Sequence, residues 1–145
     1  RGECVEKVNI YLSGGMGNLS FEEQSKWRQR IIDAINNNFD CEKKPYFFNP
    51  VNYYNFTEVR HRSEREIMEF DLNALRNSDL VIVNFNDPKS IGTAMELMLA
   101  KERNIPIIGF GVNGQAVHPW LLECCTRICD SFREMAEHVV AFYLN

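Results

Sequence analysis

Leu80-Val81-Ile82-Val83-Asn84-Phe85 is the stretch of sequence that decides the fold of this chain. Nearly all of its residues are apolar and several are β-branched, which is typical of a strand covered on both faces. Residues 86–88, Asn-Asp-Pro, interrupt the strand, and residues 92–101 then have the composition of a buried helix. The stretch therefore predicts one strand–helix unit of a parallel sheet.

The alternation of strands and helices continues in both directions from this unit. Further strands are predicted at residues 7–12, 45–48, 105–110 and 127–129. Further helices are predicted after the caps Ser20 and Ser63, each with a glutamate three residues later, and at residues 118–124 and 132–144. Residues 51–57 are aromatic and rich in Asn without a clear period, and are predicted to form a loop.

Strands that alternate with helices predict an α/β fold, a flavodoxin-like three-layer open sheet that is mostly parallel and has about five strands. We expect a single domain over residues 1–145, because no internal repeat or second core is visible. Ligands of such sheets bind beyond the carboxyl ends of the strands. The functional site is therefore expected in the loops after Leu12, Phe85 and Phe110.

The bulk composition excludes several classes of protein. A formal net charge of -4 with well mixed charges argues against a protein that binds the backbone of a nucleic acid polymer. No run of eighteen apolar residues is present, so no membrane span is expected. The charged start and the odd count of 5 cysteines favour a cytoplasmic protein without a secretory signal. Cys124, Cys125 and Cys129 lack the paired spacing of a zinc site, so we expect no metal.

Glu96 is the only ionisable residue in the apolar segment from Ile91 to Ala100. Burial of a lone carboxylate is costly unless partners hold it, although the start of a helix favours an anion. Two interpretations are open from the residues alone. Glu96 is either a nucleophile for substitution at a sugar carbon or a solvent-facing or salt-bridged glutamate on an otherwise packed helix.

Tyr11 and Asp71 favour the nucleophile. Tyr11 is expected near the end of the first strand, at the sheet edge from which Glu96 emerges, where its hydroxyl could orient Glu96. The plain alternative is a tyrosine of the core. Asp71 lies on a predicted helix and could protonate or hydrogen-bond a departing base, or could be a surface residue.

These positions resemble the nucleoside 2-deoxyribosyltransferase family over residues 8–111. The resemblance rests on a strand with Ile10-Tyr11 before a loop of small residues, an Asp71-Leu72 pair, the strand at residues 78–83 and a strand at residues 106–109. Its most specific part is the block Gly92-Thr93-Ala94-Met95-Glu96-Leu97.

The resemblance implies that Glu96 attacks the anomeric carbon of a deoxynucleoside, that Tyr11 holds Glu96 and that Asp71 assists the leaving base. The acceptor is a second base in a transferase and water in a hydrolase. No cofactor is implied, and the partners are a small nucleoside or nucleotide and further copies of the chain in a homo-oligomer. The aromatic residues 46–56 would line either the base pocket or the subunit interface. Implied substrate-binding residues are Ser13, Gly14, Gly15, Ser90 and Gly92.

Two departures from the family pattern bear on the substrate. Ser90 stands where transferases often have an Asp, and it resembles the deoxynucleoside 5′-monophosphate N-hydrolase branch, in which a Ser contacts phosphate. The loop after the first strand lacks the Arg of that branch; Arg60, Arg62 or Arg65 could replace it, or could equally form a solvated helix start. The alternatives are thus a transferase, a monophosphate hydrolase, and a nucleotide-binding or sensing module without turnover.

Overall fold

The structure, a computed structural model, describes residues 5–15, 20–53 and 61–145. The strands are β1 (Lys7–Gly14), β2 (Lys44–Phe48), β3 (Leu80–Asn84), β4 (Ile107–Phe110) and β5 (Arg127–Ile128). The helices are α1 (Phe21–Asn38), α2 (Glu64–Arg76), α3 (Ile91–Glu102), α4 (Pro119–Cys124) and α5 (Phe132–Tyr143), with a 3-10 helix η1 (Pro50–Tyr53). The strands form one sheet in the order β2-β1-β3-β4-β5, and every neighbouring pair is parallel. This order confirms the predicted flavodoxin-like open sheet.

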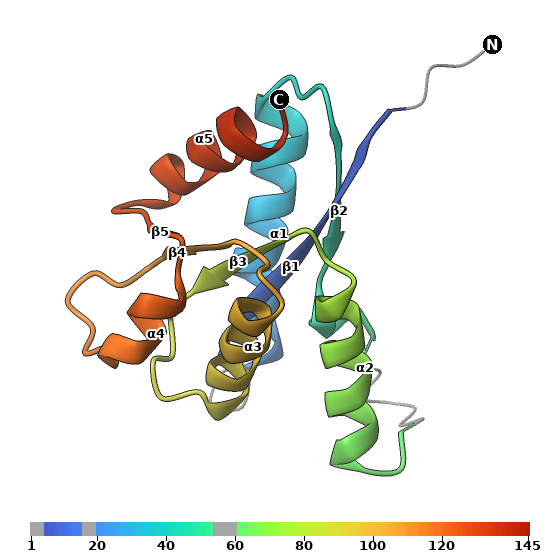
Figure 1. Cartoon of the computed structure of the whole chain (residues 1–145), viewed down its shortest axis with the longest axis vertical. Helices are drawn as coiled ribbons and strands as arrows, with labels where there is room; N and C mark the ends of the chain where they lie inside the picture. Colours follow the sequence, from blue (N-terminus) through green and yellow to red (C-terminus); the bar gives the residue numbers. More distant parts are fainter. Residues whose placement is uncertain (1–4, 16–19, 54–60) are drawn as a thin grey trace.

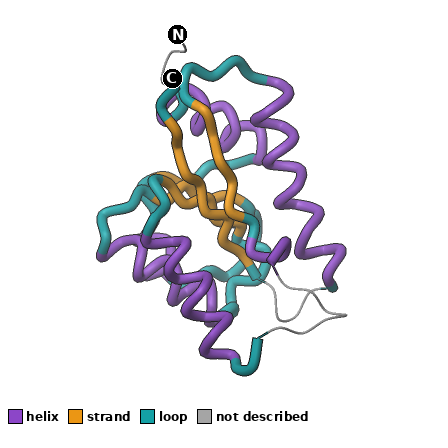
Figure 2. Tube along the Cα trace, turned by 90° about the vertical axis from the view of Figure 1, so that its right-hand side faces the viewer, coloured by secondary structure: helices purple, strands orange, loops and turns teal. Residues whose placement is uncertain are grey.

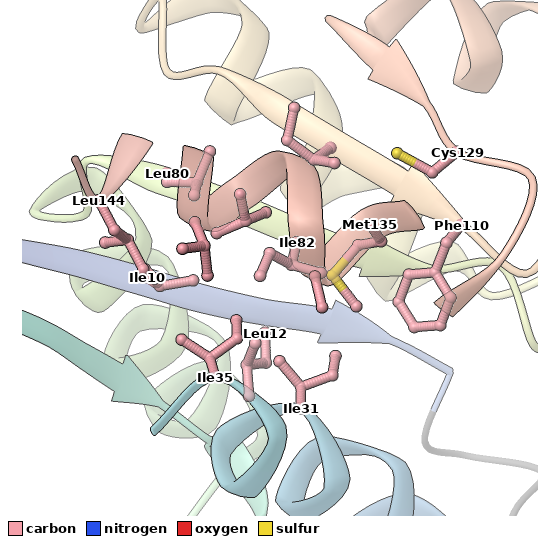
Figure 3. Packing of buried hydrophobic residues seen from close by; sticks show 14 of the residues in the cluster. Ile10, Leu12, Ile31, Ile35, Leu80, Ile82, Phe110, Cys129, Met135 and Leu144 are labelled. Atoms are coloured by element: carbon pink, nitrogen blue, oxygen red, sulfur yellow. The ribbon is translucent and has the colours of Figure 1, made fainter. Parts of the chain in front are cut away.

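Helices cover both faces of the sheet, as Figure 1 and the turned view in Figure 2 show. Helices α1 and α5 pack on one face, where their apolar residues meet Ile10, Leu12 and Ile82 (Figure 3). Helices α2, α3 and α4 pack on the other face against Tyr11 and the neighbouring strand. Successive strand residues point to opposite faces, so the odd-numbered residues of β1 face α3.

The predicted caps are present at both helices. Ser20 Oγ accepts a hydrogen bond from Glu23 N at 3.1 Å, and Ser63 Oγ accepts one from Glu66 N at 3.3 Å. Each cap satisfies a backbone donor that the first helical turn leaves without a partner. Helix α1 has 18 residues and carries several charges, and none of the helices in the described part of the chain could span a membrane.

Two predictions about local structure are wrong in part. The stretch predicted as a loop contains η1, because Pro50 fixes a backbone angle suited to a helical start; residues 54–57 lie outside the described residues. Helix α3 is not buried on all sides: Thr93, Leu97 and Ala100 face the core. The opposite face is exposed and apolar, with Ile91 76%, Met95 48% and Met98 46% accessible.

Two glycines after β4 provide a matched test of backbone packing. Gly111 has φ +80°, and a Cβ there would lie 2.3 Å from Asn84 Oδ1; Gly114 has φ +72° but nothing within 4 Å. We expect Gly114→Ala to lower the free energy of unfolding by about 1 kcal/mol, the cost of the left-handed backbone alone. Gly111→Ala adds a clash and should lower it by about 2 to 4 kcal/mol. Urea denaturation measures the free energy of unfolding of both variants. Equal losses in the two variants would contradict the close contact between Gly111 and Asn84.

Candidate active site

The loops at the carboxyl ends of β1 and β3 meet at the centre of the sheet. Gly15 N donates a hydrogen bond of 3.1 Å to Asn86 Oδ1, and a Cβ on Gly15 would lie 2.4 Å from the Cβ of Asp87. The loop after β4 joins them, since Gln115 Nε2 donates a bond of 3.0 Å to Phe85 O. Strands β1 and β3 flank the point where the strand order reverses, which is where ligands bind in this class of sheet.

Glu96 reaches this point from the second turn of α3. Tyr11 Oη donates a hydrogen bond to Glu96 Oε2, and Ser13 Oγ donates one of 2.8 Å to Glu96 Oε1. Tyr11 and Ser13 are two residues apart on β1, so both side chains point to the face that α3 covers. Each oxygen of the half-buried carboxylate thus has its own donor, which fixes the orientation of the group.

Burial raises the pKa of Glu96 to about 7, because the charged form loses hydration. The hydrogen bonds from Tyr11 and Ser13 oppose this rise, and so does the positive charge of Arg28. The negative charge of Asp71 raises the pKa of Glu96 further. The carboxylate is therefore poised to gain or lose its proton near neutral pH, as a group of an active site often is.

Asp71 belongs to the same cluster of charges. It lies in the middle of α2, which packs beside α3, and it is half-buried. Its charge acts on both Glu96 and Arg28. The site thus combines two carboxyl groups and one cation, and these come from three different helices.

Arg28 is the member of this cluster that the sequence analysis missed. Its side chain is only 1% exposed, and it donates hydrogen bonds to the carbonyl oxygens of Leu12, Gly14 and Gln24 at 3.3, 3.3 and 2.8 Å. A signal was present in the helical period. The buried residues of α1 are Gln24, Arg28, Ile31 and Ile35, so the arginine stands within the buried stripe.

Aromatic rings extend the site outward from Tyr11. The ring of Tyr11 stacks on Phe48 with centroids 5.3 Å apart, and Phe48 stacks on Tyr53 at 4.8 Å. Phe70 of α2 leans against both Phe48 and Tyr53. The outer rings are open to solvent, with Tyr53 56% and Phe70 48% exposed. We call these four residues the aromatic wall.

The other predicted substrate-binding residues lie near the cluster or at the start of α3. Gly14 is buried against Trp27, whose ring atom would lie 2.5 Å from a Cβ at this position. Ser90 caps α3: its Oγ accepts bonds from Thr93 N at 3.3 Å and from Thr93 Oγ1 at 3.0 Å. Gly92 is exposed, with open space where a side chain would be. Arg62 and Arg65 are exposed at the start of α2, and Arg60 lies outside the described residues.

Three cysteines lie around the C-terminal elements of the sheet. Cys124, Cys125 and Cys129 are free thiols around α4 and β5. Burial, with a smaller effect of Cys124, raises the pKa of Cys125 to about 12, so its thiol is a poor nucleophile. Across the described ranges, no group of three His, Cys, Asp or Glu side chains could hold a metal ion.

The fold and the cluster together define a flavodoxin-like α/β protein with an acidic site at the reversal of its strand order. A model of the family described as nucleoside 2-deoxyribosyltransferase like matches residues 7–111, and the chain belongs to this family. Family membership points to an enzyme of the nucleoside 2-deoxyribosyltransferase type. No curated protein matches the chain in sequence.

Solved structures share the fold at low sequence identity. A 2-deoxyribosyltransferase from Bacillus psychrosaccharolyticus is 18% identical with a TM-score of 0.65, over 89% of this chain and 90% of that chain. A 2-desoxiribosyltransferase from Leishmania mexicana is 17% identical with a TM-score of 0.60, over 94% and 99%. The Clostridium botulinum CMP N-glycosidase BcmB is 15% identical with a TM-score of 0.52, over 92% and 99%.

Proposed function

We propose that this protein cleaves the N-glycosidic bond of a 2-deoxyribonucleoside and transfers the deoxyribosyl group to another nucleobase through a glycosyl ester on Glu96. The observation that carries the proposal is the pair of hydrogen bonds from Tyr11 and Ser13 to the two oxygens of Glu96. A surface glutamate would have no need of two oriented donors. Family membership supports the same chemistry.

The proposed reaction has two displacements at the anomeric carbon. In the first, an oxygen of the Glu96 carboxylate bonds to this carbon while the carbon–nitrogen bond breaks and its electrons pass to the base. Asp71, protonated at this stage, transfers its proton to the departing base and is left as a carboxylate. In the second, a nitrogen of another base attacks the same carbon, the ester bond breaks, and Glu96 recovers its charge. The acceptor base loses a proton to Asp71.

The aromatic wall supports a flat ring as the leaving group. Its inner ring, Tyr11, also holds Glu96, so a base stacked against the wall would place its sugar near the carboxylate. Stacking of a base on an aromatic side chain contributes about 1 to 3 kcal/mol and tolerates different bases. The wall therefore fits a site that must accept two bases in turn.

The geometry of Ser90 favours a second candidate, the hydrolysis of deoxynucleoside 5′-monophosphates. Its Oγ lies at the amino end of α3, where backbone N–H groups and the helix dipole favour a phosphate. Ser90 carries no charge to repel a dianion, and Gly92 leaves open space beside it. In this alternative, water replaces the second base in the attack on the ester.

Chromatography of released bases separates these candidates. The protein is incubated with deoxynucleosides and with their 5′-monophosphates, each with and without a second free base. Exchange between bases is the expected result, and release only from monophosphates would favour the hydrolase. Tight binding without any release would instead support a sensing module. A homo-oligomer, which light scattering tests, is supported by the exposed apolar residues Ile91, Met95 and Met98 of α3.

The pH dependence of base release tests the state of Glu96. Attack requires the Glu96 carboxylate, so kcat/KM should rise on the acid side of its pH profile as the pH approaches the Glu96 pKa of about 7. Tyr11→Phe removes a donor that lowers this pKa and should move the rise to higher pH. The control is Tyr46→Phe, on an exposed ring of β2. An unchanged profile in Tyr11→Phe would contradict the assignment of the rise to Glu96.

A further inference from the structure

The carboxyl end of β1 extends beyond the strand beside it. Strand β2 pairs with β1 only as far as Tyr11 and Phe48, whereas β1 continues to Gly14 along β3. Lys44 N donates a hydrogen bond of 2.8 Å to Glu6 O. If β2 continued in the same register, the backbone N–H of residue 50 would donate to the carbonyl of Leu12. That residue is Pro50, which has no N–H and begins η1.

Arg28 supplies the missing donors. Its Nε donates to Leu12 O and its Nη2 to Gly14 O, both at 3.3 Å, which are the two carbonyls that β2 leaves open. Its Nη1 donates to Gln24 O at 2.8 Å, which ties the guanidinium to its own helix. The Cζ lies 4.4 Å from the centroid of the Trp27 ring. The planar fork of an arginine suits this task, because its donors are held in a fixed arrangement.

Ser13 lies between the two carbonyls that Arg28 binds. The same Ser13 donates a hydrogen bond of 2.8 Å to Glu96. The backbone of β1 is thus held from the edge by Arg28, while its side chains hold Glu96 on the face covered by α3. The charged and titratable groups that act on Arg28 are Glu96 of α3, Tyr11 of β1 and Asp71 of α2.

We propose that Arg28 is a positioning residue of the glycosyl-transfer site. It takes the place of a strand donor to fix the backbone around Ser13, and its positive charge favours the ionised form of Glu96. This proposal rests on the proposed function of Glu96. Burial lowers the pKa of Arg28 to about 10, so the guanidinium is protonated at the pH at which Glu96 must be charged.

A purely structural role for Arg28 makes different predictions. A buried arginine that only fills space and binds carbonyls would change stability without changing the ionisation of Glu96. The positioning role adds an electrostatic effect, since removal of a positive charge near a carboxyl group raises the pKa of that group. The ionisation of Glu96 therefore distinguishes the two roles.

Three substitutions separate the charge of Arg28 from its hydrogen bonds. Arg28→Lys keeps the positive charge but loses the planar set of guanidinium donors. Arg28→Gln keeps an amide donor but loses the charge. Arg28→Met keeps only the approximate volume of the side chain. The control is Arg30→Met on the same helix, where the arginine is exposed and lies over Phe132. Circular dichroism establishes that each variant is folded. Glu96 is titrated by carbon-13 NMR of the glutamate carboxyl groups, assigned by their loss in Glu96→Gln, and kcat/KM is measured from pH 5 to pH 9.

We expect Arg28→Met and Arg28→Gln to raise the pH at which Glu96 titrates and to lower kcat/KM by a larger factor at pH 6 than at pH 9. Arg28→Lys should keep the titration near that of the parent while lowering kcat at every pH. Parent-like titration in folded Arg28→Gln and Arg28→Met would overturn the proposal. If Arg28→Met does not fold, Arg28→Gln and Arg28→Lys still decide it. The NMR readout needs no turnover, so a parent protein without base release would refute the proposed function separately.

Discussion

Glu96→Gln is expected to lower the rate of base release by about 10⁴-fold or more, on the scale seen when an enzyme loses its nucleophile. Glutamine has the same size and can still accept a hydrogen bond from Tyr11 or Ser13, so the shape of the site is kept. Its amide cannot form the glycosyl ester. Base release measured by chromatography gives the rates.

The control for this substitution is Glu102→Gln, the same change at an exposed position of the same helix. It should keep the activity of the parent. Mass spectrometry of the parent after a rapid acid quench should show a deoxyribosyl adduct on the peptide that contains Glu96, and none in Glu96→Gln. Base release within tenfold of the parent in Glu96→Gln, or an adduct on another residue, would remove Glu96 from the role of nucleophile.

Asp71→Asn is expected to lower base release by about 10² to 10⁴-fold, the range for loss of a general acid or base. The asparagine keeps the shape but cannot transfer a proton to the departing base. The loss should depend on the leaving group. An aryl 2-deoxyriboside whose phenolate leaves without a proton should be cleaved by Asp71→Asn at close to the parent rate.

Glu69→Gln serves as the control, because Glu69 is exposed on the same helix as Asp71. Rates for both substrate classes are compared in all three proteins. If Asp71→Asn slows both classes by the same factor, proton transfer to the base is not its function. Asp71 would then act only by shaping the site or through its charge on Glu96.

The sequence predicted the order of strands and helices because that order depends on local patterns. The continuous apolar run of β3 and the period-two pattern of Ile10 and Leu12 predicted parallel strands, and the serine caps predicted helix starts. The register of β2 could not be predicted, since its side chains alternate only weakly. Nor could the face of α3, because Ile91, Met95 and Met98 look like core residues until the sheet is placed.

The site was predictable only where a residue type conflicts with its local pattern. Glu96 stands out in an apolar helix, and Tyr11 and Asp71 were tied to it by the family resemblance. Arg28 was overlooked because an arginine among the charged residues of α1 looks solvated. Its hydrogen bonds to β1 depend on two distant facts: β2 stops at Phe48, and residue 50 is a proline. No pattern within α1 could show that two carbonyls of β1 lack a strand partner.

The burial of Glu96 favours its protonated form, whereas the proposed reaction requires the carboxylate. Its pKa is about 7 in the folded chain and 4.5 when exposed, so the unfolded chain releases this proton first as the pH rises. The folded state then binds more protons, and the contribution of Glu96 to stability, full below pH 4.5, is lost as the pH rises through 7. The contribution of Glu96 to the free energy of unfolding is thus most favourable when its carboxyl group is protonated. A glycosyl ester is also uncharged, so the covalent intermediate would not carry the desolvation cost that the buried carboxylate carries.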